Sequence, residues 1–458
     1  MSESTSKRVR LLRDLSRDPG ILILAYPYAR TWREISRKSV QQSWSEVPPG
    51  EHAAMHVHIP FCRTKCTYCD FLAYYGRSDS EIERYLDLLR QDIRVVAGMA
   101  GHVAVESMEF GGGTPSLLSV EQVAAIMDGV RARFRFSPDA DVTMEVLPDT
   151  SITTNLMAGW KREGITRLSF GVQFLDDDLK KKLNREDTTE EILRILRSVR
   201  EAGFDDFSVD LMCGLPEQTE ESWRHTCQEI LRLHPPHVCV FPVSVRHEGI
   251  ALYNYRAALL RPSRSRQTYE EAYQFLLEAG YQRTTRHNFR LGKQDFTYER
   301  LMADLAPVIG LGAHSISQAK DCIYKNHSHL GKYETAVSTG EPPLHTGHIF
   351  PEEEKPYNYA VRRIEHLRLD GKDFAARFGR SLREAFPEEI SLLEEFGLAR
   401  MNGADLELTP DGVYYTAAVK RTFFHPSAWD RFESMRPEEF KLDRGIFDAV
   451  ESPASVST

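Results

Sequence analysis

The sequence predicts an α/β fold built from consecutive strand–helix units. From about residue 53, short β-rich runs alternate with longer amphipathic patterns. The gaps between successive runs exceed the dozen residues that a parallel crossover needs, so the strands are expected to lie parallel. A cysteine-rich loop directly follows the first strand, at the strand end where parallel barrels place their active sites.

Six strands and six helices are expected in this region. The strands are predicted at residues 55–59, 107–110, 142–146, 167–172, 207–212 and 238–243, and the helices at 81–97, 120–134, 152–163, 189–202, 220–233 and 270–279. Residues 308–314 read as a glycine-rich strand and turn.

Three further segments flank the strand–helix region, which we place at 51–345. Residues 1–50 are expected to form an extension packed outside it, ending at a Pro-Pro-Gly break. Residues 346–440 change to helices with one short hairpin, a pattern that resembles a winged-helix unit. Residues 441–458 are Ser-rich towards the end and are expected to form a flexible tail.

Composition excludes several classes of protein. The chain has 458 residues, 41% of them hydrophobic, and a formal net charge of −9. A nucleic-acid partner would favour a basic excess, so we expect none. Residues 1–17 lack the apolar core of a signal peptide, and no run approaches the ~18 apolar residues of a membrane span. Seven cysteines are too few and too irregular for a disulfide framework. We therefore expect a cytoplasmic protein without a membrane partner.

Three cysteines carry the strongest chemical signal. Cys62, Cys66 and Cys69 lie within eight positions, in the stretch His56-Val-His-Ile-Pro-Phe-Cys-Arg-Thr-Lys-Cys-Thr-Tyr-Cys69. A four-iron cluster normally takes four thiolates, so three leave one iron open for chemistry. The alternatives are a zinc site or structural cysteines, but no nearby Cys or His pair completes a zinc set.

The CX3CX2C spacing after His-Ile-Pro-Phe resembles the signature of the radical S-adenosylmethionine (SAM) superfamily. The resemblance implies a partial (β/α)6 barrel, a [4Fe–4S] cluster and SAM chelated to the open iron. It also implies that an electron splits SAM into methionine and a 5′-deoxyadenosyl radical. A low-potential donor such as flavodoxin or ferredoxin would supply that electron.

A glycine triplet follows the second strand, in Phe110-Gly-Gly-Gly-Thr-Pro115. Glycines allow a backbone to approach a ligand closely. A tight turn is the alternative, whereas a phosphate loop would need a Gly-Lys-Ser/Thr sequence that is absent. By resemblance, Gly112, Gly113 and Thr114 contact the amino group of SAM.

Two carboxylates interrupt apolar strands. Glu145 and Asp210 would be costly there without hydrogen-bond donors, which ribose hydroxyls could supply. A neighbouring amide could serve equally. By resemblance, His56, Gln173, Arg185 and Met212 also line the SAM pocket. Arg185 suits a bidentate grip on a carboxylate, although a salt bridge is its ordinary role.

The combination of VHIPFC, GGGTP, GVQ, NRED, DLxxGLP and GLGAHS, from His56 to His314, resembles the oxygen-independent coproporphyrinogen III oxidase-like (HemN-like) branch of the superfamily. That branch includes porphyrinogen decarboxylases, haem-cleaving enzymes, haem chaperones, and methylases or cyclopropanases of secondary metabolites. His314 is expected to act as a proton donor or as a capping group.

Departures from the pattern narrow these alternatives. The decarboxylases carry cysteine where this chain has Phe71 and tyrosine where it has His56. The chaperones carry an HNxxYW element, of which only His287 and Asn288 remain. By elimination, we expect an enzyme that acts on a small-molecule substrate and uses a second SAM as methyl or methylene donor.

Overall fold

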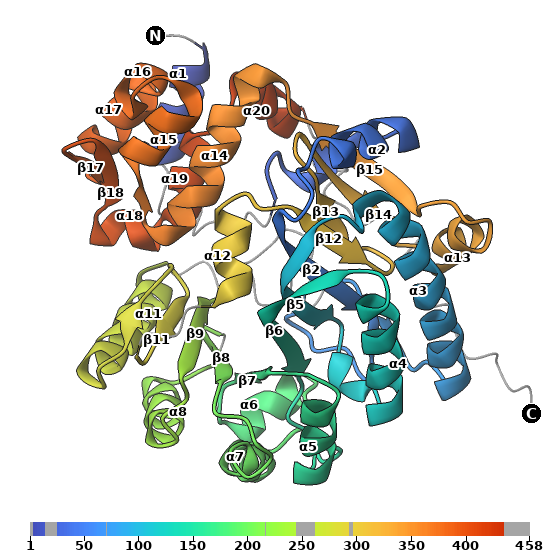
Figure 1. The fold of residues 1–458 in the computed structure, drawn as a ribbon. Coiled ribbons are helices and arrows are strands. Elements are labelled where there is room, and N and C mark those ends of the chain that lie inside the picture. The colour runs from blue at the N-terminus through green and yellow to red at the C-terminus, as the bar shows by residue number, and fades with distance from the viewer. Residues whose placement is uncertain are drawn as a thin grey trace, which may run out of the picture.

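The computed structural model describes residues 3–13, 25–69, 71–215, 217–243, 262–292 and 296–434. Its centre is one curved sheet of thirteen strands in the order β1-β15-β14-β13-β12-β2-β5-β6-β7-β8-β9-β11-β10. Seven consecutive strands, from β12 to β9, are parallel, and helices cover the outside of the curve (Figure 1).

All six predicted strands are present as parallel neighbours. They are β2 (His52–Ile59), β5 (Ala104–Gly112), β6 (Arg135–Val146), β7 (Arg167–Gln173), β8 (Phe207–Cys213) and β9 (His237–Pro242). The parallel crossovers follow from the helices between them, as expected. The α/β class and the partial barrel are therefore confirmed.

Apart from α6, which was not predicted, the connecting helices also lie where amphipathic periodicity predicts them. They are α3 (Asp79–Ala100), α4 (Val120–Arg131), α5 (Thr154–Arg162), α6 (Asp177–Lys182), α7 (Thr189–Ser198), α8 (Glu220–Arg232) and α11 (Pro262–Glu278). Capping boxes at Ser78, Ser119 and Thr188 begin α3, α4 and α7, because each hydroxyl accepts from the third helical amide. Their apolar faces pack on the outer face of the sheet in one large core.

One edge of the sheet was only partly predicted. β12 (Val308–Leu311) is the expected glycine-rich strand, and it extends the parallel sheet beside β2. An antiparallel run then follows through β13 (Ile316–Gln318), β14 (Cys322–Asn326) and β15 (Leu344–Ile349), with α13 (Leu330–Ser338) between the last two. At the other edge, β11 (Asn288–Arg290) pairs with β9 and β10 (Gln282–Arg283). The short helix α12 (Thr297–Ala303) lies against β2 and β5.

The C-terminal residues form a second apolar core. Its helices are α14 (Lys355–Arg363), α15 (Gly371–Phe378), α16 (Leu382–Ala385), α17 (Pro387–Glu395), α18 (Pro410–Tyr414), α19 (Thr416–Thr422) and α20 (Pro426–Glu433). A small antiparallel sheet joins them, with β16 (Arg368–Leu369), β18 (Asp405–Leu408) and β17 (Ala399–Asn402) in that order. Helices with a short hairpin were expected here.

The N-terminal residues contact both cores. α1 (Glu3–Arg13) docks on the C-terminal unit, where buried Arg8 pairs with Glu389 at 2.6 Å. β1 (Arg33–Glu34) pairs with β15, and α2 (Arg37–Ser45) buries Trp44 in the main core. Residues 3–13 and 25–50 are therefore integrated more deeply than an external strap. The boundaries at 51, 346 and 441 stay predictions, and the predicted tail lies outside the described residues.

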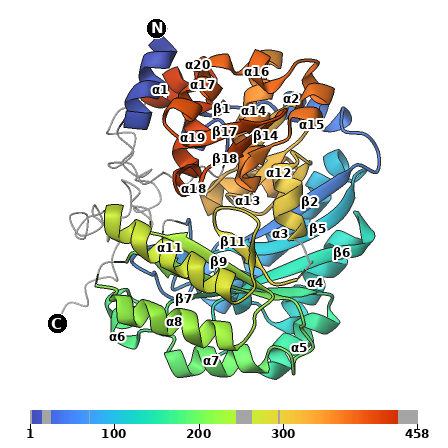
Figure 2. The ribbon, with the colours of Figure 1, turned by 90° about the vertical axis from the view of Figure 1, so that its left-hand side faces the viewer.

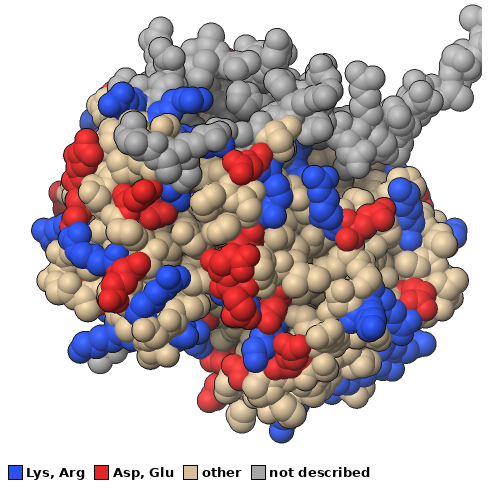
Figure 3. Space-filling model, turned by 90° about the horizontal axis from the view of Figure 1, so that it is seen from above, with Lys and Arg blue, Asp and Glu red and all other residues tan. Residues whose placement is uncertain are grey.

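The surface agrees with the mixed composition. On the face seen in Figure 3, acidic and basic side chains are interspersed without a continuous basic stripe. Among the described residues, no helix has both the length and the apolar character that a membrane crossing requires.

Candidate active site

The cysteine loop and the glycine turn are held together by backbone hydrogen bonds. The amide of Gly113 donates to Ile59 O at 2.8 Å, and the amide of Thr114 donates to Phe61 O at 2.7 Å. A Cβ on Gly113 would lie 2.6 Å from Phe61 O, so this close approach requires glycine. The hydroxyl of Thr114 donates to the Cys62 thiol at 3.2 Å. The predicted neighbours therefore meet at the C-terminal ends of β2 and β5.

Arg185 braces the other side of the cysteine loop. Its guanidinium donates to both carboxylate oxygens of Asp187, at 2.8 and 3.1 Å, and to Gly171 O at 2.8 Å. A fourth bond, at 2.7 Å, reaches the hydroxyl of Tyr68, which lies between Cys66 and Cys69 in the sequence. The carboxylate that Arg185 grips is thus Asp187, and its position beside the loop makes it a support for the thiols.

The chemistry of the three thiols suits a cluster, although among the described residues no three His, Cys, Asp or Glu side chains are already gathered around one metal position. All three cysteines are free and half-buried. Burial raises the pKa of Cys62 to about 11, opposed by the Thr114 hydrogen bond. Burial also raises the pKa of Cys66, opposed by the charge of Arg185 and a hydrogen bond from Tyr68. Thiolate ligands must be deprotonated, and these polar neighbours favour that form. Cys62, Cys66 and Cys69 would hold the cluster.

Three carboxylates gather below this loop on β5, β6 and β8. Burial raises the pKa of Glu145 well above its usual range, and the charges of Glu109 and Asp210 raise it further. Burial raises the pKa of Asp210 to about 6, opposed by hydrogen bonding with Cys239. Such a group of acids is unfavourable unless cations or hydrogen-bond donors reach it. The sulfonium, ammonium and ribose groups of SAM offer both.

Gln173 and Met212 lie at the same end of the sheet. Gln173 has a φ of 67° at the end of β7, and its amide nitrogen would lie 3.2 Å from a Cβ on Gly171. Met212 packs with Tyr68 against a small apolar cluster next to the cysteine loop. An apolar surface at this point suits an adenine ring, and the adenine contact of Met212 stays a prediction.

Three histidines line the β2 and β12 side. Nδ1 of His56 lies 3.6 Å from Glu109, and Nε2 of His56 lies 3.4 Å from His58 Nδ1. The His314 ring is 5.8 Å from that of His58, and its Nδ1 is hydrogen-bonded to Ser328 at 2.6 Å. Burial lowers the pKa of His314 to about 4, so it is neutral at pH 7. A neutral imidazole is a poor proton donor, which weakens the predicted donor role of His314.

Sequence reasoning overlooked Tyr68, Glu109 and His58. The signal for His58 was available, because His56 and His58 are two residues apart on one strand and must share a face. A similar signal was available for Glu109, because it lies two residues before Gly111 on β5 and shares its face of the sheet. Tyr68 carried no signal apart from its place between two cysteines.

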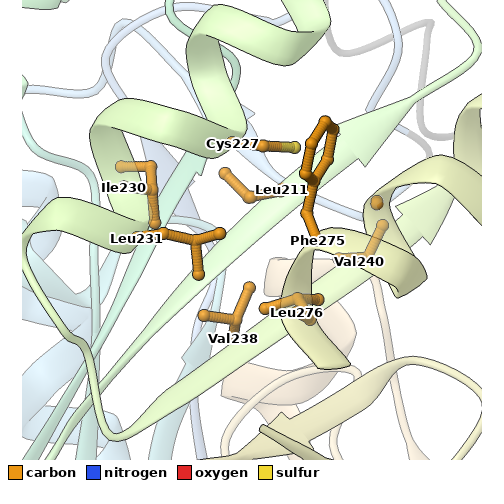
Figure 4. Close-up of a pocket in the computed structure, with 9 residues that line it drawn as sticks. Leu211, Cys227, Ile230, Leu231, Val238, Val240, Phe275 and Leu276 are labelled. Carbon is orange, nitrogen blue, oxygen red and sulfur yellow. The ribbon is translucent and has the colours of Figure 1, made fainter. Parts of the chain in front are cut away.

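A separate cavity lies outside the barrel, between the sheet and helices α8 and α11 (Figure 4). Figure 2 shows these two helices side by side on the outside of the sheet. Its lining is apolar and comes from Leu211, Cys227, Ile230, Leu231, Val238, Val240, Ala272, Phe275 and Leu276. It offers no charged group to a substrate, so we regard it as a packing gap in the core.

A parallel partial barrel with three thiols after its first strand and a glycine turn after its second defines a cluster-dependent radical enzyme. Residues 56–230 match the family model described as the radical SAM superfamily.

Similarity to individual proteins extends further along the chain. The oxygen-independent coproporphyrinogen III oxidase of Escherichia coli K12 is 27% identical over 384 residues, covering 80% of this chain and 83% of the relative. The heme chaperone HemW of Bacillus subtilis is 28% identical, covering 78% and 95%. The solved structure of the E. coli coproporphyrinogen III oxidase superposes with a TM-score of 0.78 at 25% identity, covering 87% of this chain and 96% of that one.

Residues 56–230 therefore form a radical SAM domain, and the similarity to oxygen-independent coproporphyrinogen III oxidases extends in sequence and structure over about four-fifths of the chain. Its cofactors are a [4Fe–4S] cluster and SAM. The residues described above suit both groups.

Proposed function

We propose that this radical SAM enzyme uses a second SAM as a one-carbon donor, for C-methylation or cyclopropanation of an sp2 carbon in a small secondary metabolite. When bound, the cluster and the first SAM supply a carbon-centred radical that removes a hydrogen atom. In this proposal the second SAM is a substrate, and its methyl group loses that hydrogen.

The observation that carries the proposal is the group of buried carboxylates Glu109, Glu145 and Asp210. Burial raises the pKa of Glu145 and of Asp210, so positive charge would stabilise the ionised form of both carboxylates. In the family, the ammonium and carboxylate of the first SAM chelate the iron, which leaves one sulfonium for three acids. A second sulfonium would neutralise more of this charge.

Phe71 supports the same proposal. Its side chain is 58% exposed two residues after Cys69, at the position where the decarboxylases carry cysteine. No thiol is available there to take part in decarboxylation.

The chain's own residues would hold the reactants and exclude water. Gly112, Gly113 and Thr114 would face the amino end of the first SAM, and Glu145 its ribose. Met212 would cover adenine. Holding the reacting atoms near contact distance gives the selectivity that a radical reaction needs.

Porphyrinogen oxidative decarboxylation is the second candidate. It is supported by the curated relatives, which include coproporphyrinogen III oxidases that match about four-fifths of this chain. Haem cleavage and haem carriage are further alternatives within the branch, and HemW is among the relatives.

A labelling experiment separates these candidates. Anaerobically reconstituted protein would be reduced with dithionite in the presence of methyl-deuterated SAM. A second SAM held with its methyl group near the radical should place deuterium in 5′-deoxyadenosine even before the acceptor is known. Undeuterated 5′-deoxyadenosine, with loss of CO2 from added coproporphyrinogen III, would establish decarboxylation instead. Stoichiometric haem binding without SAM cleavage would establish carriage.

The electron donor and the compartment follow from the cofactor. We propose a flavodoxin or ferredoxin as the donor, and the reducing cytoplasm as the location, because the cluster needs low-potential electrons and protection from oxygen.

A further inference from the structure

The cysteine loop carries two cations between its first two thiols. Arg63 and Lys65 stand between Cys62 and Cys66 in the chain, where Arg63 is exposed and Lys65 is half-buried. Cys62 and Cys66 would hold the cluster, so the residues between them are the ones that separate it from solvent on this side. Any protein that approaches the cluster across this loop therefore meets positive charge first.

Lys65 is connected to the cysteines through an aromatic ring. Its Nζ lies 5.8 Å from the centroid of the Tyr75 ring, which is within the range of a cation–π contact. Tyr75 is on β4 (Tyr74–Tyr75), where it is paired with Cys62 on β3 (Phe61–Cys62). Burial raises the pKa of Tyr75, and the charges of Cys69, Cys62 and Cys66 raise it further. Tyr75 therefore borders both the cation and the three predicted cluster ligands.

The end of α6 adds two lysines to the same surface. Lys181 and Lys182 are exposed in the last turn of this helix. The turn after the helix is fixed to the cysteine loop, because the side chain of Asn184 donates to Lys65 O at 2.7 Å and Leu183 O accepts from a loop amide at 3.0 Å. The lysines of α6 and the cations of the loop therefore belong to one surface.

This surface differs in sign from the molecule as a whole. We call its four cations the basic patch: Arg63, Lys65, Lys181 and Lys182. Among the described residues of the loop and of the turn after α6, two carboxylates accompany them, Glu217 paired with Lys182 and exposed Glu186. Asp177 lies at the other end of α6 and accepts from a hydroxyl on α7, and Asp70 lies outside the described residues. The chain carries a net charge of −9, so a local excess of cations beside the cluster ligands stands out.

We propose that the basic patch is the docking surface for a small acidic electron-carrier protein. One electron passes from the reduced carrier, which is oxidised, to the cluster, which is reduced, and no bond forms or breaks. Opposite charges steer such an encounter, and they offset the repulsion between two acidic proteins. Electron-transfer complexes bury small interfaces, below about 1,200 Å², so a patch of this size is sufficient.

The inference rests on the proposed function only in that a carrier protein delivers the electron. It holds whichever reaction the radical then performs. Failure of the deuterium experiment would change the reaction and leave the docking surface in place, so the two proposals can fail separately.

A binding measurement tests the inference without turnover. Anaerobically reconstituted protein would be immobilised for biolayer interferometry and exposed to a purified bacterial flavodoxin, with cytochrome c as a basic carrier for comparison. We expect flavodoxin to bind at low ionic strength and to bind more weakly as salt is added, because salt screens exposed charges. Cytochrome c should not bind.

Matched charge reversals locate the surface. Arg63→Glu combined with Lys181→Glu should weaken flavodoxin binding by about tenfold at low ionic strength. The control combines Lys38→Glu with Lys372→Glu, which changes the net charge by the same amount. Both control lysines are exposed in the first turns of α2 and α15, where a carboxylate suits the helix dipole. These helices lie at the end of the molecule opposite α6 (Figures 1 and 2), so the control should bind flavodoxin as the unchanged protein does.

The rate of cluster reduction separates docking from an effect on the cluster itself. The patch variant should be reduced about tenfold more slowly by reduced flavodoxin, and at an unchanged rate by illuminated deazariboflavin, a small uncharged reductant. Iron content would report whether each variant holds its cluster. If Arg63→Glu disturbs the cluster, Lys181→Glu with Lys182→Glu tests the same surface from α6, outside the cysteine loop.

Four results would overturn the inference. They are flavodoxin binding that is insensitive to salt, equal binding of flavodoxin and cytochrome c, equal weakening in the patch and control variants, and equal slowing with both reductants. The last would assign the cations to the reduction potential of the cluster instead of to a partner.

Discussion

Removing Asp187 should destabilise the protein more than removing Arg185. Both side chains are almost fully buried, with 1% and 2% exposure, and they share two hydrogen bonds. Lys180, also 1% exposed, lies 3.4 Å from the same carboxylate. Arg185→Ala therefore leaves Asp187 with one cation, whereas Asp187→Ala leaves Arg185 without its anion and Lys180 with the half-exposed Asp177, 3.9 Å away.

Breaking a buried ion pair from one side typically costs about 3–5 kcal/mol. We expect Arg185→Ala near the lower end of this range and Asp187→Ala at or above the upper end. The free energy of unfolding would be measured by anaerobic urea denaturation followed by tryptophan fluorescence. The double variant Arg185→Met with Asp187→Leu should lose less than Asp187→Ala, because fewer buried charges remain unpaired. Equal losses in the two single variants would refute this reading of the network.

Three other predictions concern the cofactor and the core. Changing any one of Cys62, Cys66 or Cys69 to Ala should abolish SAM cleavage. Iron analysis and an assay for 5′-deoxyadenosine would check this. Full cluster content and SAM cleavage in the triple variant would contradict the cluster assignment. Glu145→Ala should weaken SAM binding by about 1.5–3 kcal/mol, which is about tenfold or more in affinity. Equilibrium dialysis would measure the dissociation constant. An unchanged dissociation constant would remove Glu145 from the site. Burial raises the pKa of Asp92 to about 6 from 3.8, so the folded state binds the proton more tightly and stability should fall as pH rises from about 4 to about 6. That loss amounts to about 3 kcal/mol, and urea denaturation of Asp92→Asn across this range should lack it.

The sequence predicted the parallel strands well because each obeys a simple periodic rule. Apolar runs separated by capped amphipathic helices leave one topology, and the observed order from β2 to β9 follows chain order. The antiparallel strands β13 to β15 were missed because they are three to six residues long and carry polar residues such as Lys325 and His345. Such short strands are defined by their neighbours rather than by their own pattern.

The candidate site was predictable where motifs carried it and unpredictable where tertiary contacts decide it. Cys62, Gly113 and Glu145 were found from local patterns, and the fold brings them together. Arg185 was found as well, but sequence alone could not show that Asp187 and Tyr68 would occupy its donors. Asp92 lies on a helix more than 200 residues from Gly312, so only the folded chain relates the two.

The hydrogen bonds between the cysteine loop and the glycine turn have a consequence for how this enzyme can change. Because the amides of Gly113 and Thr114 bond to the strand and loop that lead into Cys62, the two halves of the cofactor end must shift as one rigid piece. Substitutions in α12 or in β11 would reach that piece through side chains. Tyr298 on α12 is an example, because burial and then the charge of Glu109 on β5 raise its pKa. Mutations in α12 and β11 can therefore change the substrate preference. The cysteine loop and the glycine turn, which hold the radical-generating cofactors, keep their relative positions.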